Sequence, residues 1–226
     1  QYGNEHRSGD GKNSCGCDGG IITLFYDCIR AVLKVLAFVL MPVRVYGREN
    51  LDREGAYILA CNHQSYMDVP CLIIADKRRI RFMARSSFYR FRFVKWLFGK
   101  MGAFPVNVRT GDVDAMRNAL KVLRAKEVLG IFPQGRRVKE TPYPKKEDML
   151  GGVGFLAAKS GTAIVPCVFE RRPLIFRINR LHIGKAIEVP NGGTISEKTE
   201  KINGMLFDAM ISLFPDGPET SDKLKN

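Results

Sequence analysis

One histidine and one carboxylate lie close together in the sequence, at the end of an apolar segment. His63 and Asp68 are five positions apart, and the apolar run 56–61 ends just before them. An imidazole that is held by a carboxylate can take a proton from a substrate hydroxyl as a general base. The sequence therefore predicts a His–Asp pair that acts on an alcohol. The alternative is a structural pair, in which Asp68 simply starts a helix beside the ring.

Two predicted elements must position this pair. Residues 56–61 are typical of a buried strand, and residues 68–75 are typical of the start of a short apolar helix. Residues five positions apart do not share a face of a helix or of a strand. The loop between His63 and Asp68 must therefore fold back to bring the two side chains together. The sequence contains no Gly-x-Ser-x-Gly elbow, which disfavours an acyl-serine enzyme. Cys61 would share a strand face with His63, so a Cys–His acyl-enzyme is an alternative, beside simple packing of the thiol.

The composition is that of a folded and strongly basic protein. The chain has 226 residues, of which 45% are hydrophobic, and 36 Lys and Arg against 23 Asp and Glu give a net charge of +13. This length accommodates one α/β domain. The charge favours an anionic partner, such as a membrane surface, a phosphorylated substrate, an acidic carrier protein or a nucleic acid. The six cysteines have no metal-binding spacing, which indicates reduced thiols in a protein that faces the cytosol.

Residues 21–42 predict an amphipathic helix that docks on a membrane. As a helix, residues 21–41 would be about 31 Å long, enough to cross a bilayer. However, Thr23, Asp27, Arg30 and Lys34 fall within an arc of about 60°, and each charge at the centre of a span would cost roughly 2.5 to 3.5 kcal/mol. We therefore expect a peripheral or monotopic helix at the cytoplasmic face of the membrane. A core helix of the domain is the alternative.

A second basic segment, residues 77–100, combines nine cationic side chains with seven aromatic ones and contains no acid. This mixture is typical of a cationic surface whose aromatic rings lie at the level of lipid headgroups. A non-catalytic module that binds anionic lipid or nucleic acid is the alternative. No ribonucleoprotein or helix-turn-helix pattern accompanies the segment, so we expect no nucleic-acid partner.

The remaining pattern predicts one domain over residues 43–214, with a single mixed, mostly parallel sheet flanked by helices. Residues 1–20 are expected to be a flexible tail or an expression remnant, and residues 215–226 a C-terminal tail. Further strands are predicted at 43–46, 128–132, 163–169, 174–178 and 187–189, and further helices at 113–125, capped by Asp112, and from a Thr194–Glu197 capping box through Leu213. His182 has no carboxylate nearby in the sequence and is expected to be structural.

The loop Pro133–Arg137 follows the predicted strand 128–132 and carries two arginines. Exposed backbone and guanidinium groups at the carboxyl end of a strand are suited to a phosphate. The alternative is a solvated basic loop.

Four blocks of the sequence together resemble the lysophospholipid and glycerol-phosphate acyltransferase family, most closely the 1-acylglycerol-3-phosphate acyltransferases. The similarity covers residues 43 to about 190. The blocks are Asn62-His63 to Asp68, which resembles the His-x4-Asp motif, then Phe104 to Arg109, Phe132 to Arg137, and Val165-Pro166.

This resemblance implies transfer of a fatty acyl group from acyl-carrier protein or acyl-CoA to the sn-2 hydroxyl of lysophosphatidic acid, giving phosphatidic acid. It assigns His63 as the base and Asp68 as the residue that orients it. No metal or redox cofactor is implied. The residues that would bind the acceptor are Arg85, in place of a family lysine, and Arg109, Gln134, Gly135, Arg136 and Arg137.

Two positions depart from the family pattern. Gln134 stands where the family has glutamate, and Arg136 where it has threonine. One negative charge is thus exchanged for one positive charge, which should tighten anion binding. The acceptor could therefore be another lyso-phospholipid or glycerol 3-phosphate.

Overall fold

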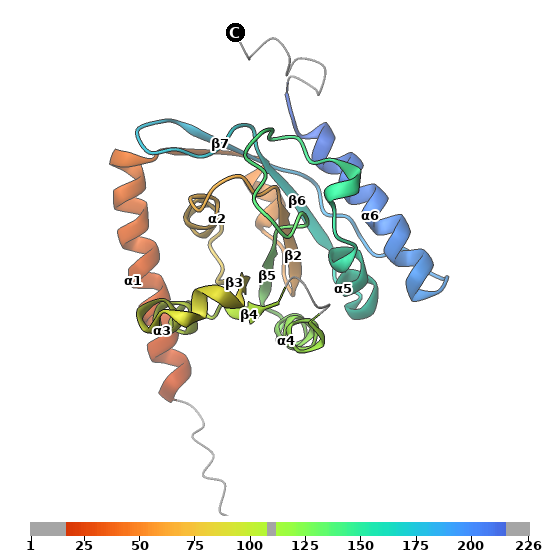
Figure 1. The fold of residues 1–226 in the computed structure, drawn as a ribbon, viewed down its shortest axis with the longest axis horizontal. Helices are drawn as coiled ribbons and strands as arrows, with labels where there is room; N and C mark the ends of the chain where they lie inside the picture. The colour runs from red at the N-terminus through yellow and green to blue at the C-terminus, as the bar shows by residue number, and fades with distance from the viewer. Residues whose placement is uncertain (1–16, 108–111, 216–226) are drawn as a thin grey trace, which may run out of the picture.

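A computed structural model describes residues 17–107 and 112–215, in which a seven-stranded sheet lies between two groups of helices (Figure 1). The strand order is β1-β7-β6-β2-β5-β3-β4. The strands are β1 (Val43–Tyr46), β2 (Tyr57–Cys61), β3 (Ile80–Arg85), β4 (Phe104–Val106), β5 (Val128–Ile131), β6 (Ile164–Phe169) and β7 (Asn179–Ile183). The α-helices are α1 (Cys17–Leu40), α2 (Asp68–Ala75), α3 (Arg92–Met101), α4 (Val113–Arg124), α5 (Gly152–Ser160) and α6 (Ile195–Ser212).

The sheet is mixed and mostly parallel, as predicted. Strands β2 to β6 run in one direction, whereas β7 is antiparallel to β6 and parallel to β1. The carboxyl ends of five strands therefore meet at one edge of the sheet. Because β1 and β7 run the other way, they begin at this same edge.

The central strand β2 shows how the sheet separates two apolar layers. Tyr57, Leu59 and Cys61 face a core that includes side chains of α1 and α2, while Ile58 and Ala60 face a core built with α4, α5 and α6. Successive side chains of a strand point to opposite faces, and both faces are covered, so the strand is apolar throughout. Figure 1 shows α1, α2 and α3 on one side of the sheet and α5 and α6 on the other.

Helix α1 begins earlier than predicted, at Cys17, and one of its faces packs against the domain. Tyr26 is buried, its hydroxyl accepts a hydrogen bond from the Ile80 backbone N–H at 3.1 Å, and Arg30 donates to the Lys77 carbonyl. Leu24, Val32 and Val35 remain exposed. Within the described residues, no helix has both the length and the apolar character to span a bilayer. The helix thus packs on the domain with one face and leaves an apolar stripe uncovered.

Two predicted strands are absent from the sheet. Residues 174–178 form part of the loop between β6 and β7, and Ile187 makes only an isolated bridge to Ile164. Both predicted helix caps are present, with the Asp112 side chain on the N–H of Ala115 and the reciprocal Thr194–Glu197 capping box. Of the predicted tails, 1–20 and 215–226, residues 1–16 and 216–226 lie outside the described residues, as does Arg109, whereas residues 17–20 belong to α1.

The basic segment 77–100 is not one continuous surface. It contains β3, a 3-10 helix over Ser86–Arg90 and α3. Phe82 is buried, and Phe98 makes edge-to-face contacts with Phe88 and Tyr89. The exposed aromatic side chains of the segment are Phe91, Phe93 and Trp96.

Candidate functional site

The candidate site lies at the edge where the parallel strands end. His63 follows β2 by two residues, and the loop from Phe132 to Val138 follows β5, which pairs with β2 in register from Tyr57–Val128 to Ala60–Ile131. Arg85 ends β3, beside Val106 at the end of β4. Parallel pairing of β2 with β5 therefore brings together His63 and the loop that starts at Phe132, which are 69 positions apart in the sequence.

The loop between β2 and α2 folds back so that His63 and Asp68 meet. Asp68 is the first residue of α2 and has no exposed surface, and its Oδ2 atom lies 2.7 Å from His63 Nδ1. The same oxygen accepts hydrogen bonds from the backbone N–H groups of Gln64 at 2.7 Å and Ser65 at 2.8 Å. The carboxylate thus holds both the ring and the loop that carries it. With Nδ1 engaged, Nε2 is the ring nitrogen left for a substrate.

A second loop, which follows β5, is joined to the His63 loop on both sides of the histidine. The backbone N–H of His63 donates to Gln134 Oε1 at 2.9 Å, and the His63 carbonyl accepts from the Val138 N–H at 2.8 Å. The Phe132 ring stacks on the imidazole with centroids 3.9 Å apart. These contacts fix the height and tilt of the ring above the sheet edge.

The structure explains how glutamine can stand at position 134, where the family usually has glutamate. The side chain is buried, with only 4% of its surface exposed, and the bond to His63 uses an acceptor oxygen. Glutamine and glutamate both offer such an oxygen. The change from the family's usual residue therefore leaves this contact possible while it removes a charge beside the histidine.

The predicted arginines are placed differently from one another. Arg137 lies over the ring of Tyr66, with its guanidinium carbon 3.6 Å from the ring centroid. Arg136 lies 2.7 Å from Asp148, so its charge is already paired within the protein. Arg85 is exposed at the end of β3, and Arg109 lies outside the described residues.

Gly135, the last of the predicted binding residues, occupies the tight turn of this loop. Its φ of 60° is in the left-handed region, and its N–H donates to the Phe132 carbonyl at 2.9 Å. Glycine adopts this conformation without a steric penalty. After this turn, Arg137 lies over Tyr66 and the Val138 N–H reaches the His63 carbonyl.

Asn62 was part of the sequence motif, but its role could not be predicted. It is fully buried at the end of β2, where Oδ1 accepts from the Phe169 N–H at 2.8 Å and Nδ2 donates to the carbonyls of Phe169 and Pro142. It therefore ties the His63 loop to the end of β6 and to the segment before α5. The sequence signal was its position next to the histidine, without any indication of these distant partners.

The structure argues against the alternative in which Cys61 forms an acyl-enzyme. The Cys61 side chain is completely buried, and burial raises the pKa of its thiol well above the ordinary value. A nucleophilic cysteine needs an accessible thiolate. Cys61 is instead a packing residue of the core between the sheet and α2.

Cys61→Ala should therefore keep the acyl-transfer turnover that the sequence resemblance implies within about threefold of the wild type, because a completely buried thiol is not available as a nucleophile. Removing one buried sulfur should cost about 1 kcal/mol of unfolding free energy. Turnover and thermal unfolding check both, and intact-mass analysis after a rapid quench should show no acylated protein. An acyl adduct that disappears in Cys61→Ala would contradict this assignment.

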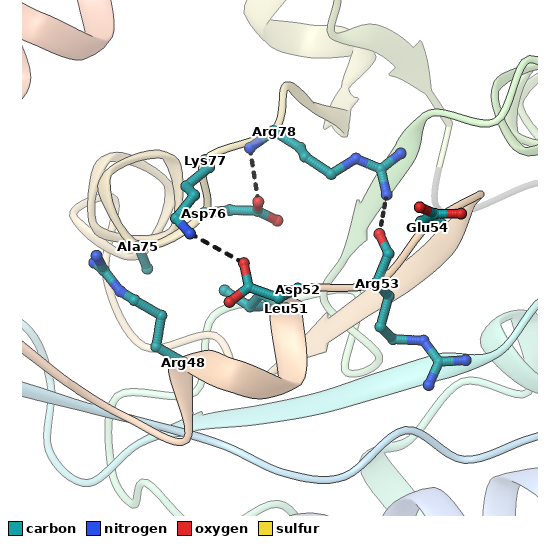
Figure 2. Close-up of a pocket in the computed structure, with 9 residues that line it drawn as sticks. All are labelled: Arg48, Leu51, Asp52, Arg53, Glu54, Ala75, Asp76, Lys77 and Arg78. Atoms are coloured by element: carbon teal, nitrogen blue, oxygen red, sulfur yellow. Dashed lines mark hydrogen bonds and ion pairs between the residues drawn. The ribbon is translucent and has the colours of Figure 1, made fainter.

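A pocket of about 290 Å³ opens at the opposite edge of the sheet, where β2 and β3 begin (Figure 2). Its charged groups largely satisfy one another. Lys77 pairs with Asp52 at 3.1 Å, Arg78 donates to the Arg53 carbonyl at 3.1 Å, and the Arg78 N–H donates to Asp76. The pocket is therefore a separate structural feature and does not include His63.

A model of the Acyltransferase family matches residues 42–170, more than half of the chain. This region contains the His63–Asp68 pair and the loop that follows β5. The chain belongs to the Acyltransferase family. The match ends at residue 170, so α1 and the loop between β6 and β7 lie outside it.

Curated relatives agree with this placement. A 1-acyl-sn-glycerol-3-phosphate acyltransferase of Bacillus subtilis is 27% identical over 139 residues, which is 61% of this chain and 67% of the relative. Enzymes of the same name from Borreliella burgdorferi and Saccharomyces cerevisiae are 30% and 26% identical over 63% and 81% of this chain. The matches span 57% and 64% of those two relatives.

A solved structure shows the same fold. It is the crystal structure of the 1-acyl-sn-glycerophosphate (LPA) acyltransferase PlsC from Thermotoga maritima, with a TM-score of 0.60 and 20% sequence identity. The superposition covers 87% of this chain and 88% of that one. The predicted fold class of this family member is confirmed.

Proposed function

We propose that this family member is a 1-acylglycerol-3-phosphate O-acyltransferase, which transfers a fatty acyl group to the sn-2 hydroxyl of lysophosphatidic acid and forms phosphatidic acid. The observation that carries the proposal is the 2.7 Å contact between His63 and the buried Asp68, on a loop that also contacts Arg137 through Tyr66. The names of the curated relatives supply the substrate class. The donor is acyl-CoA or acyl-carrier protein.

In the proposed reaction, His63 Nε2 accepts the proton of the acceptor hydroxyl while Asp68 holds the Nδ1 side of the ring. The hydroxyl oxygen forms a bond to the thioester carbon, and the carbon–sulfur bond then breaks. The departing thiolate takes up the proton from His63, which returns the imidazole to its starting state. A general base placed in this way contributes about 10² to 10⁴ in rate.

We propose Arg137 as the main anchor of the acceptor phosphate. Its guanidinium is held against Tyr66, only three positions from His63, and forms no ion pair among the described residues. Arg136 differs because Asp148 already pairs with it. This contrast within one loop provides a matched pair of variants.

Arg137→Met should raise the KM for lysophosphatidic acid by about ten- to a hundredfold, because a charge-assisted contact to phosphate is lost while an unbranched apolar side chain still fills the space of the arginine's aliphatic part. Arg136→Met should raise it by less than about threefold, as expected for the loss of an exposed ion pair. Steady-state kinetics on both variants check the assignment. Equal effects of the two substitutions would contradict it.

A panel of acceptors tests the proposed function as a whole. Labelled acyl-CoA and acyl-carrier protein would each be offered with lysophosphatidic acid, other lyso-phospholipids and glycerol 3-phosphate, and the acylated product identified. We expect phosphatidic acid to form fastest. Preferred acylation of a different acceptor, or no acyl transfer with any of them, would overturn the proposed substrate.

We also propose that α1 holds the enzyme at the cytoplasmic face of the membrane without crossing it. Its exposed stripe of Leu24, Val32 and Val35 suits an interfacial position, and α3 adds Phe93 and Trp96 beside it, since Trp96 contacts Phe25 of α1 at 5.5 Å. An enzyme that takes its acceptor from a bilayer gains access to it in this position.

A further inference from the structure

The loop between β6 and β7 presents apolar side chains to solvent. Residues 171–178 have the sequence RRPLIFRI, and Leu174, Ile175, Phe176 and Ile178 are all exposed. Phe176 is 82% exposed, the highest value among the large exposed hydrophobic residues described. Clusters of this kind on a folded domain usually mark a contact surface.

This loop has a fixed shape that its own residues provide. Asn179 is buried at the start of β7, where Oδ1 accepts from the Leu174 N–H at 3.0 Å and Nδ2 donates to the carbonyls of Leu174 and Arg177, both at 3.1 Å. Pro173 is also buried. These hydrogen bonds within the loop fix its backbone, and its apolar side chains point to solvent.

The backbone conformation of Phe176, at the exposed tip of this loop, has an energetic cost. Its φ of 61° is in the left-handed region, which is unfavourable for a bulky residue and usually taken by glycine or asparagine. Its backbone N–H donates to the carbonyl of Leu40, the last residue of α1. The strained residue thus joins the loop to the end of the helix that we place at the membrane.

The charges around the loop are almost all positive. Arg171, Arg172 and Arg177 form no ion pair with any residue in the described ranges, and together with Arg180 they line a hollow of about 380 Å³. The one acid of the hollow, Glu170, is already engaged, with Arg180 at 3.2 Å and His182 Nε2 at 2.5 Å. Unpaired guanidinium groups of this kind bind phosphate oxygens.

The position of the loop agrees with a role near the reaction. It follows β6 and precedes the antiparallel β7, so it lies at the same sheet edge as His63, and Asn62 bonds to Phe169 at its base. Figure 1 shows the connection into β7 reaching across to the end of α1. The loop also lies outside residues 42–170, which the family model matches.

We propose that residues 171–178 form a second membrane contact, in which Ile175 and Phe176 enter an anionic bilayer and Arg171, Arg172 and Arg177 bind lipid phosphates. An apolar tip with arginines on both sides matches a bilayer, which offers phosphates and an apolar layer at neighbouring depths. The inference rests on the proposed function in one respect, since it assumes that the acceptor is a membrane lipid.

The test measures co-sedimentation of the full chain with phosphatidylcholine vesicles that contain phosphatidylglycerol at about 30 mol%, without acyl donor. Phe176→Asn should weaken binding about tenfold, because one aromatic side chain is no longer inserted. Asparagine tolerates the left-handed conformation, so the loop should keep its shape. The double variant R171Q/R172Q should weaken binding about 25-fold at low salt, at about fivefold per arginine, and less at high salt.

Matched controls come from α6, which lies on the opposite side of the molecule from α1 (Figure 1). Met205 and Lys201 are exposed there, and Met205→Gln and Lys201→Gln should leave vesicle binding within twofold of the wild type. Thermal unfolding verifies that each variant is folded. Ile175→Ser serves as a second apolar variant if Phe176→Asn does not fold.

The results separate this inference from the proposed function. Loop variants that lose vesicle binding but acylate detergent-dispersed lysophosphatidic acid normally would support both. Loop-dependent vesicle binding by a chain that does not acylate lysophosphatidic acid would support the loop contact alone. Vesicle binding that is unchanged in folded Phe176→Asn or Ile175→Ser and in R171Q/R172Q would overturn the inference and leave a protein partner as the occupant of this surface.

Discussion

Replacing His63 by alanine should lower the rate of acyl transfer to lysophosphatidic acid by about a hundredfold or more. The ring is the proposed base, and a placed general base contributes about 10² to 10⁴. The KM for the acceptor should change little, because the phosphate contacts belong to another loop. Turnover at saturating acceptor, measured with detergent-dispersed substrate, separates these two quantities.

A matched control is available in the second histidine–carboxylate pair. His182 Nε2 lies 2.5 Å from Glu170 Oε1, at the base of the loop between β6 and β7. The sequence did not indicate this carboxylate partner, because Glu170 is 12 positions away. His182→Ala should leave turnover on dispersed substrate within about threefold. Similar losses in His63→Ala and His182→Ala would mean that damage to the fold, and not loss of a base, explains both.

Asp68→Asn should lower turnover by about tenfold or more while the protein remains folded. One oxygen of Asp68 receives all three contacts, from His63 Nδ1, Gln64 N and Ser65 N. An asparagine with its oxygen in this place can accept the same three hydrogen bonds, so the loop is kept. What is lost is the negative charge that stabilises the imidazolium formed when the ring takes up a proton.

Asp68→Ala provides the contrast, because it also removes the acceptor for two backbone N–H groups. A buried N–H without a partner costs about 1 to 3 kcal/mol. This variant should therefore lose both turnover and thermal stability, whereas Asp68→Asn loses mainly turnover. Kinetics and thermal unfolding on the two proteins check the distinction. Turnover of Asp68→Asn within twofold of the wild type would contradict the proposed role of the charge.

Much of the scaffold follows from short-range patterns. The strands β2, β5 and β6 are apolar runs with both faces buried, and the two helix caps at Asp112 and Thr194 are local motifs that the sequence states directly. The segment 174–178 misled the prediction because its Leu, Ile and Phe also suit a strand. Side-chain bonds from Asn179, and not strand pairing, determine its conformation.

The candidate site was predictable in its members but not in its connections. His63 and Asp68 are five positions apart and belong to one motif. By contrast, the bond from His63 to Gln134 joins residues 71 positions apart, and the bond from Phe169 to Asn62 joins residues 107 positions apart. Such pairs depend on the order of strands in the sheet, which no local pattern of residues specifies.

The attachment of His63 to the loop after β5 has a consequence for acceptor choice. The backbone of His63 is bonded on one side to Gln134 and on the other to Val138, and Arg137 lies between these two attachment points. The imidazole and the guanidinium are therefore carried by two loops that are bonded to each other. With His63 as the proposed base and Arg137 as the proposed phosphate anchor, the distance between the acceptor's hydroxyl and its anionic group would decide the fit, so lengthening that distance by one methylene should slow the reaction even when the charge is unchanged.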